Sequence, residues 1–209
     1  MHMPEPYEPD ARSHWQEQIV ADSVALLNSV LLKHHPELIW DVGPPSKNEM
    51  EKLRQGFQKA PEQFFELLTI FDYTNTEFFS YINPIALDDL ANACGKQFDF
   101  YAEFAPVDDG DEGWIADQHN CCRTDKRWRD DWLPFAEIDG DPIFLDMNPL
   151  ENGIPGQVVS AHSDGWSLVI QGYSIAHWLN RIAENIELEP ALARPWVFTP
   201  FPPPHGHAG

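Results

Sequence analysis

Residues 128–179 read WRDDWLPFAEIDGDPIFLDMNPLENGIPGQVVSAHSDGWSLVIQGYSIAHWL, and this stretch decides the fold. Apolar runs at 132–137 and 143–146 flank Asp139-Gly140, and runs at 157–161 and 166–170 flank a Ser-Asp-Gly sequence. Glycine tolerates the positive φ of a tight turn, so the pattern predicts two β-hairpins. Apolar residues then recur at helical spacing, which predicts a helix over 174–187. Its inward residues are Ile175, Trp178, Leu179, Ile182 and Ile186.

Start signals for helices occur upstream of this stretch. Ser13 and Gln16 fit a capping box, in which two side chains satisfy backbone N–H groups, so a first helix is expected over 13–34. Ser46 and Glu49 repeat the pattern and predict a second helix. Each helix has an apolar face; the residues concerned are Val20, Val24, Leu27 and Leu31 in the first, and Met50, Leu53 and Phe57 in the second.

Pro61 suits the first turn of a third helix, with Phe64, Phe65, Leu68 and Phe71 inward. A short extended piece is expected at 78–82 and a fourth helix at 85–101. Six prolines follow Glu189, so a non-helical tail is predicted.

Helices, an antiparallel meander and a closing helix together indicate an α+β fold. We expect N-terminal helices and a central, twisted, mostly antiparallel sheet with helices packed on it. Three regions are predicted: an extension with the first helix (1–39), the domain itself (40–188) and a Pro-rich tail (189–209).

Charge restricts the function. The chain of 209 residues has 13 Lys and Arg against 34 Asp and Glu, a net charge of −21, and no Lys or Arg occurs between Arg129 and Arg181. Such a charge repels nucleic acid and anionic membranes and speeds encounter with a basic partner. A plain solubility role is the alternative interpretation.

One acidic segment suggests where a partner docks. Acids gather beside an aromatic residue at 108–114, and further acids lie at the 139–140 turn. An aromatic anchor with an acidic rim is typical of a docking patch, although a solvated loop has the same composition. The predicted protein-binding residues are Asp108, Asp109, Asp111, Glu112, Trp114, Asp139 and Asp141.

Patterns for catalysis, metals and cofactors are weak. His119, Cys121 and Cys122 lack the spacing of a four-ligand zinc site. Ser160, His162 and Asp164 lie too close along the chain for a typical Ser-His-Asp triad. We therefore predict no catalytic residue, no metal site and no cofactor.

Asp139, Asp141 and Asp146 lack the order of an EF-hand loop. We expect Asp146, which ends an apolar run before Asn148, to cap the following loop through backbone N–H groups. A metal-dependent hydrolase using His119 and His162 is the enzymatic alternative.

The order of short motifs over residues 40–187 resembles the SMI1/KNR4 family (SUKH superfamily). The motifs are Trp-Leu-Pro-Phe-Ala from Trp132 through Ala136, which contains Pro134, Asp-Gly-Asp from Asp139, Phe-Leu-Asp-Met-Asn-Pro around Asp146, Gly-Gln-Val-Val from Gly156, and Trp-Leu at Trp178. The Pro-Pro-Ser and Pro-Glu-Gln-Phe sequences at 44–46 and 61–64 resemble the family's N-terminal helices. The family's Asn-Gly after these helices is replaced by Asp-Tyr-Thr-Asn at 72–75.

The resemblance implies a non-enzymatic α+β domain whose motif residues build the scaffold. Bacterial relatives are often immunity proteins that neutralise nuclease- or deaminase-type toxins, and fungal relatives are scaffolds in cell-wall synthesis and signalling. We expect an immunity protein with a basic toxin partner, and a regulatory or scaffold protein is the alternative.

Three cysteines, with no signal-peptide pattern, predict a cytoplasmic location. Neither nucleic acid nor membrane is an expected partner, and a monomer or weak dimer is expected.

Overall fold

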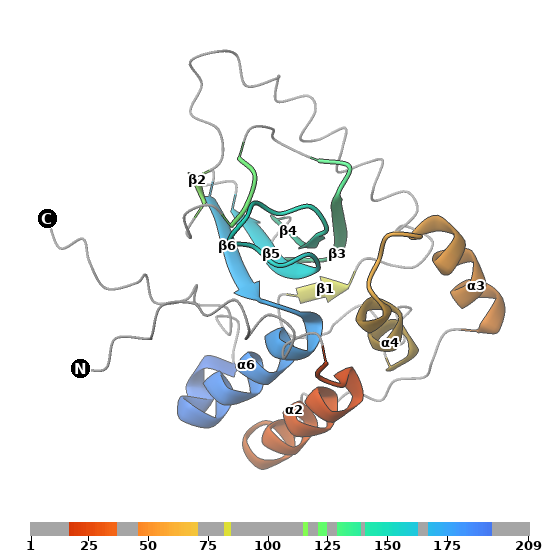
Figure 1. Ribbon diagram of the computed structural model, residues 1–209. Coiled ribbons are helices and arrows are strands. Elements are labelled where there is room, and N and C mark those ends of the chain that lie inside the picture. The colour runs from red at the N-terminus through yellow and green to blue at the C-terminus, as the bar shows by residue number, and fades with distance from the viewer. Residues whose placement is uncertain are drawn as a thin grey trace, which may run out of the picture.

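The computed structural model describes residues 17–36, 46–70, 82–84, 115–116, 121–124, 129–138, 141–162 and 167–193. Helices pack on one face of a mostly antiparallel sheet, which confirms the α+β fold (Figure 1). The helices are α2 (Val20–His34), α3 (Lys47–Gly56), α4 (Glu62–Ile70) and α6 (Ile175–Leu188). The strands are β1 (Ile82–Pro84), β2 (Ile115–Ala116), β3 (Trp132–Ile138), β4 (Asp141–Asp146), β5 (Gln157–His162) and β6 (Ser167–Gly172).

The sheet has the order β1-β3-β4-β5-β6-β2, and only β2 pairs in parallel among the described strands. The two predicted hairpins supply its centre, because β3 pairs with β4 and β5 with β6. Both turns lie outside the described residues. The β3–β4 register shifts between Pro134 and Ala136, where proline has no N–H to give to the ladder.

Three helices confirm most of the predicted pattern. α3 starts directly after Ser46, α4 starts directly after Pro61, and α6 starts directly after Ser174. The Ser174 side chain accepts a hydrogen bond from the backbone N–H of His177, so it caps α6. The predicted helix at 85–101 lies outside the described residues, and so does the extended piece except for its last residue, Ile82.

The predicted start of the first helix is wrong. α2 begins at Val20, and residues 17–19 are not helical because Ile19 has an extended backbone (φ −84°, ψ 124°). Ser13 and Gln16, which suggested the earlier start, lie outside the described residues. The expected end at His34 is confirmed.

The tail is also not wholly non-helical, because Pro190–Ala193 forms one turn of 3-10 helix. Proline is compatible with the first position of a helix, where its missing N–H needs no partner.

The sheet separates two apolar clusters. Residues of α2, α3, α4 and α6 pack with Leu133, Ile143 and Val158 on one face, and α2 is part of this core. On the other face Trp132 stacks on Phe144, with ring centroids 4.4 Å apart. No described helix is long and apolar enough to cross a bilayer.

Candidate protein-binding surface

The predicted docking patch consists of seven residues, of which the structure describes Asp141. Asp108, Asp109, Asp111, Glu112, Trp114 and Asp139 lie outside the described residues. Asp141 is half-buried at the start of β4, opposite Ile138 of β3. The predicted patch is therefore represented by one residue at the end of a hairpin.

The predicted scaffold residues lie in the core or at tight backbone positions. Trp178 contacts Phe135 edge-on, with ring centroids 5.4 Å apart. The Trp178 backbone also approaches Gly172 so closely that a Cβ there would lie 2.8 Å from it. Gly156 has φ +87°, which a residue with a side chain rarely adopts. These residues position α6 and the loop before β5.

Asp146 and Gln157, which we call the loop anchor, hold the loop between β4 and β5. The Asp146 carboxylate accepts hydrogen bonds from the Asn148 backbone N–H at 3.1 Å and from the Gln157 amide at 3.3 Å. Gln157 also accepts from the Ile154 backbone N–H at 3.0 Å and donates to the Cys121 carbonyl at 3.2 Å. The expected cap by Asp146 is therefore present.

The loop anchor is buried, since Asp146 is 1% exposed and Gln157 is fully buried. Burial raises the pKa of Asp146 to about 6, against the hydrogen bonds from Asn148 and Gln157 that lower it. Burial also raises the pKa of the neighbouring Cys122 thiol well above its usual range, which leaves a weak nucleophile. The cluster therefore stabilises the fold and has no access for a substrate.

The two alternative chemistries find little support here. Among the described residues, no group of three or more His, Cys, Asp or Glu is arranged to hold a metal ion. Ser160 Oγ lies 2.9 Å from His162 Nε2, but Ser160 is 2% exposed and its hydroxyl also accepts a hydrogen bond from the Gln171 amide at 2.8 Å. His119 and Asp164 lie outside the described residues. A buried hydroxyl on a central strand is poorly placed to attack a substrate.

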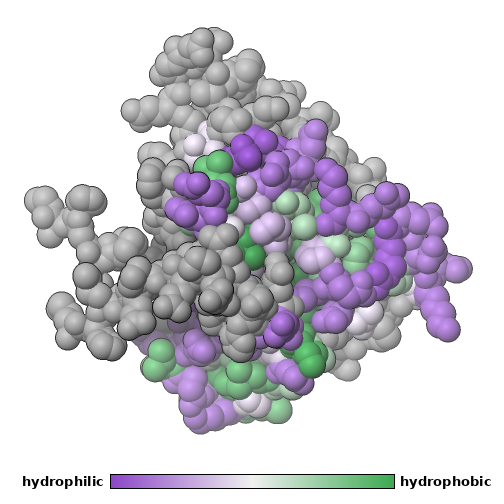
Figure 2. Space-filling model, in the orientation of Figure 1, coloured by the Kyte–Doolittle hydropathy of each residue, from purple (hydrophilic) through white to green (hydrophobic). Residues whose placement is uncertain are grey.

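A shallow depression of about 420 Å³ opens where α2 begins. We call it the acidic depression because two carboxylates and no described Lys or Arg line it. Its residues are Glu17, Gln18, Ile19, Asp22, Ser23 and Leu26, with Asn180 from α6. Ile19 is 56% exposed and Leu26 is 45% exposed. Figure 2 shows apolar side chains among hydrophilic ones at the lower edge of the molecule, where α2 and α6 lie.

Gln18 fixes the backbone of the depression to two other helices. Its carbonyl accepts a hydrogen bond from the Gln63 amide of α4 at 2.9 Å, and its side-chain oxygen accepts from Asn180 of α6 at 3.3 Å. Gln63 also accepts from the Ala176 backbone N–H at 3.4 Å, near the start of α6. Segment 17–19 therefore has a defined position before any partner binds.

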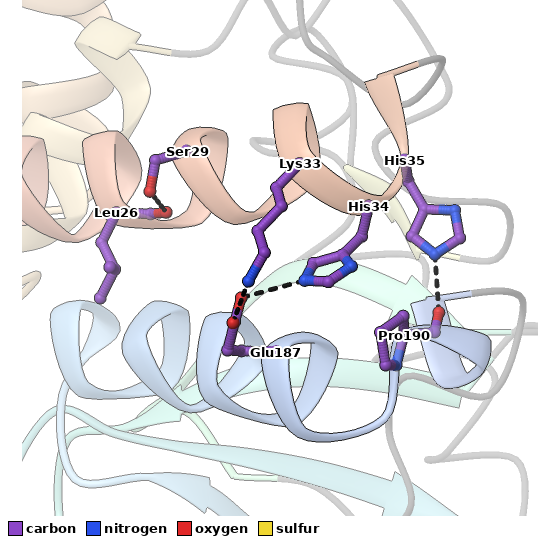
Figure 3. A network of polar contacts seen from close by, with 7 residues as sticks. All are labelled: Leu26, Ser29, Lys33, His34, His35, Glu187 and Pro190. Carbon is purple, nitrogen blue, oxygen red and sulfur yellow. Dashed lines mark hydrogen bonds and ion pairs between the residues drawn. The ribbon is translucent and has the colours of Figure 1, made fainter.

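The other end of α2 is held by complementary charge (Figure 3). Lys33 and His34 both contact the Glu187 carboxylate of α6, the latter at 3.0 Å, and these contacts lower the pKa of Glu187. His35 contacts the Pro190 carbonyl at 2.6 Å. Because α2 and α6 meet at corresponding ends, they run in the same direction.

Most described basic side chains are engaged within the chain. Eight Lys and Arg lie in the described ranges, and at least five of them bind a carboxylate or a backbone carbonyl of this protein. The five are Lys33 with Glu187, Arg54 with Glu62, Lys59 with Asp131, Arg123 with the Asn148 carbonyl, and Arg181 with the Gln171 carbonyl. These contacts reduce the positive charge that is free to meet a partner.

The sequence did not reveal the acidic depression. In a helix that begins at Ser13, the spacing of Ile19 and Leu26 adds both to the apolar face, whereas the structure exposes both, and the true start at Val20 leaves Ile19 at a helix end. An apolar residue at the N-terminal end of this helix is the sequence feature that would have indicated a binding site there.

We find no family model that matches this chain and no curated protein with significant similarity to it. The resemblance to the SMI1/KNR4 family therefore rests on the motif residues alone.

Proposed function

We propose that this protein is a non-enzymatic, acidic protein-binding domain of the immunity type, which neutralises a basic nuclease- or deaminase-type toxin by occluding it. The net charge of −21, with at least five of the eight described Lys and Arg residues already engaged inside the chain, is the observation that supports this most. A toxin that grips nucleic acid has a positive cleft, and an acidic protein approaches such a cleft rapidly.

The apolar side chains of the acidic depression support binding to a protein in particular. Charge speeds encounter, but desolvated apolar anchors usually contribute most of the affinity of an interface. Exposed Ile19 and Leu26 beside two carboxylates combine both features. The SMI1/KNR4 resemblance agrees with this role, and the protein acts without cofactor or metal.

The test is co-expression of the full chain with the product of each neighbouring gene. A toxic basic protein that becomes harmless, and that co-purifies with this chain at about 50 mM salt but not at 1 M, supports the proposal. The proposal is wrong if no neighbouring product is toxic and no basic protein binds in low salt. Binding that salt does not change would favour the regulatory or scaffold role.

A further inference from the structure

The acidic depression has the chemistry of a docking site for a particular kind of segment. Resting on the proposed function, we infer that it receives a surface segment of the partner in which a large apolar side chain is flanked by Lys or Arg. The apolar side chain lies against Ile19 and Leu26, and the basic groups face Glu17 and Asp22.

The position of Ile19 is evidence that the depression binds an apolar side chain, because an exposed isoleucine there does not stabilise α2. It is the N-cap of α2, its side chain makes no capping hydrogen bond, and it is 56% exposed. Ser, Thr, Asp or Asn at an N-cap satisfies a backbone N–H, which an aliphatic side chain cannot do. Residues that break a local rule without structural benefit tend to occur at functional sites.

The carboxylates decide the charge of the partner. The start of a helix carries a partial positive charge that by itself attracts anions. Here Asp22 lies in the first turn of α2 and Glu17 lies beside it, so an anionic group would meet two negative charges. A second copy of this chain, which also carries −21, is disfavoured for the same reason.

The hydrogen bonds of Gln18 support a site that exists before binding. Contacts to Gln63 and Asn180 hold segment 17–19 against α4 and α6, and Ser23 donates to the Ile19 carbonyl at 3.3 Å. A site whose backbone is already fixed loses little conformational freedom when a partner binds.

The first measurement uses the isotope-labelled full chain and three synthetic peptides, followed by NMR chemical shifts. The peptides are acetyl-Lys-Leu-Lys-Lys-Leu-Lys-amide, its Leu-to-Ser version and its Lys-to-Glu version. At about 50 mM salt we expect the first to shift the signals of Ile19, Asp22, Leu26 and Asn180. The Ser version should bind about tenfold more weakly at this site, and the Glu version should not bind there.

The second measurement compares matched variants with the first peptide. Leu26→Ser should weaken binding about tenfold, and Leu32→Ser should leave it unchanged. Both residues are exposed on α2 (45% and 58%), but only Leu26 lines the depression.

A second pair of variants tests the carboxylates. Glu17→Lys with Asp22→Lys should abolish binding of the first peptide. Glu51→Lys with Asp130→Lys, an equal change in net charge on exposed residues elsewhere, should weaken it far less. Circular dichroism verifies that each variant is folded.

The outcomes separate this inference from the proposed function. If the basic peptides bind but shift other residues, or if the matched pairs weaken binding equally, the docking site is wrong and the acidic binding function stands. If only the Glu version binds at the depression, or if no basic peptide binds, the charge argument is wrong for the docking site and for the proposed function alike.

Discussion

The loop anchor and the acidic depression use the same kinds of groups in opposite ways. In the loop anchor one carboxylate is buried, and the polar atoms around it are joined by hydrogen bonds. In the acidic depression two carboxylates lie beside exposed aliphatic side chains. Burial with satisfied partners gives stability, whereas exposure of mismatched groups is expected where a protein binds something else.

The largest expected effect is on the loop anchor. Gln157→Leu removes the amide partner of Asp146, the acceptor of the Ile154 N–H and the donor to the Cys121 carbonyl. Leaving such buried groups without these bonds should lower the free energy of unfolding by about 3–5 kcal/mol. Urea unfolding followed by tryptophan fluorescence measures the change.

Gln171→Leu is the matched control, since Gln171 is also buried in a strand but donates to the hydroxyl of Ser160. It should cost about 1–2 kcal/mol. Equal losses in the two variants would show that the Asp146 carboxylate adds nothing to the loop anchor.

The second prediction concerns pH. The pKa of Asp146 is raised by burial to about 6, so the folded state binds its proton more readily and this group gives more stability as pH falls from 6 to 4. Burial lowers the pKa of His177 to about 4, so the unfolded state protonates first and this group loses stability as pH falls from 6.5 to 4. Each effect amounts to about 3 kcal/mol, and together they should nearly cancel.

Single variants should separate the two opposing effects of pH on the free energy of unfolding. His177→Asn keeps an acceptor for the Tyr173 N–H and should make the protein relatively more stable toward pH 4. Asp146→Asn should make it relatively less stable over the same range. Urea unfolding at pH 4, 5, 6 and 7 measures both, and parallel curves for the two variants would contradict the assignment.

The third prediction tests the backbone of the anchored loop. Gly156 has φ +87°, while a Cβ at this position would lie 3.5 Å from Pro61, an ordinary contact. Gly156→Ala should therefore cost about 1–2 kcal/mol from backbone strain alone. Gly153→Ala is the comparison: its Cβ would lie 2.5 Å from the Cys121 carbonyl oxygen, so it should cost more. Thermal unfolding that ranks the two in the opposite order would refute this explanation.

The smallest expected effect has the opposite sign. Ile19→Ser supplies an N-cap for α2 and should raise the free energy of unfolding by about 0.5–1 kcal/mol. Ile19→Ala, which shortens the side chain without capping the helix, is the control. Removing the Gln157 amide from the loop anchor should only destabilise the protein. A gain at Ile19 would therefore mark the acidic depression as a place where stability is not optimised.

The sequence predicted the hairpins well because each strand is a short apolar run and each pair of runs flanks a turn sequence, Asp-Gly or Ser-Asp-Gly. β3, β4, β5 and α6 begin or end within two residues of the predicted bounds. The start of α2 was missed because Ser13 and Gln16 offered a good local pattern, and helix ends depend on tertiary contacts such as that of Gln18 with Gln63. The acidic depression was unpredictable for the same reason, since the residues that support it, Gln63 and Asn180, come from two distant helices.

The contacts of Gln63 determine how late in protein synthesis segment 17–19 can reach its final position. Gln63 reaches back 45 residues to Gln18 and forward 113 residues to Ala176. A growing chain whose residue 176 is still inside the ribosome cannot complete this bridge. A fragment that stops before α6 also lacks Asn180. Binding of the proposed partner segment at the acidic depression should therefore appear only after α6 has emerged from the ribosome, and a fragment that ends before α6 should bind that segment more weakly.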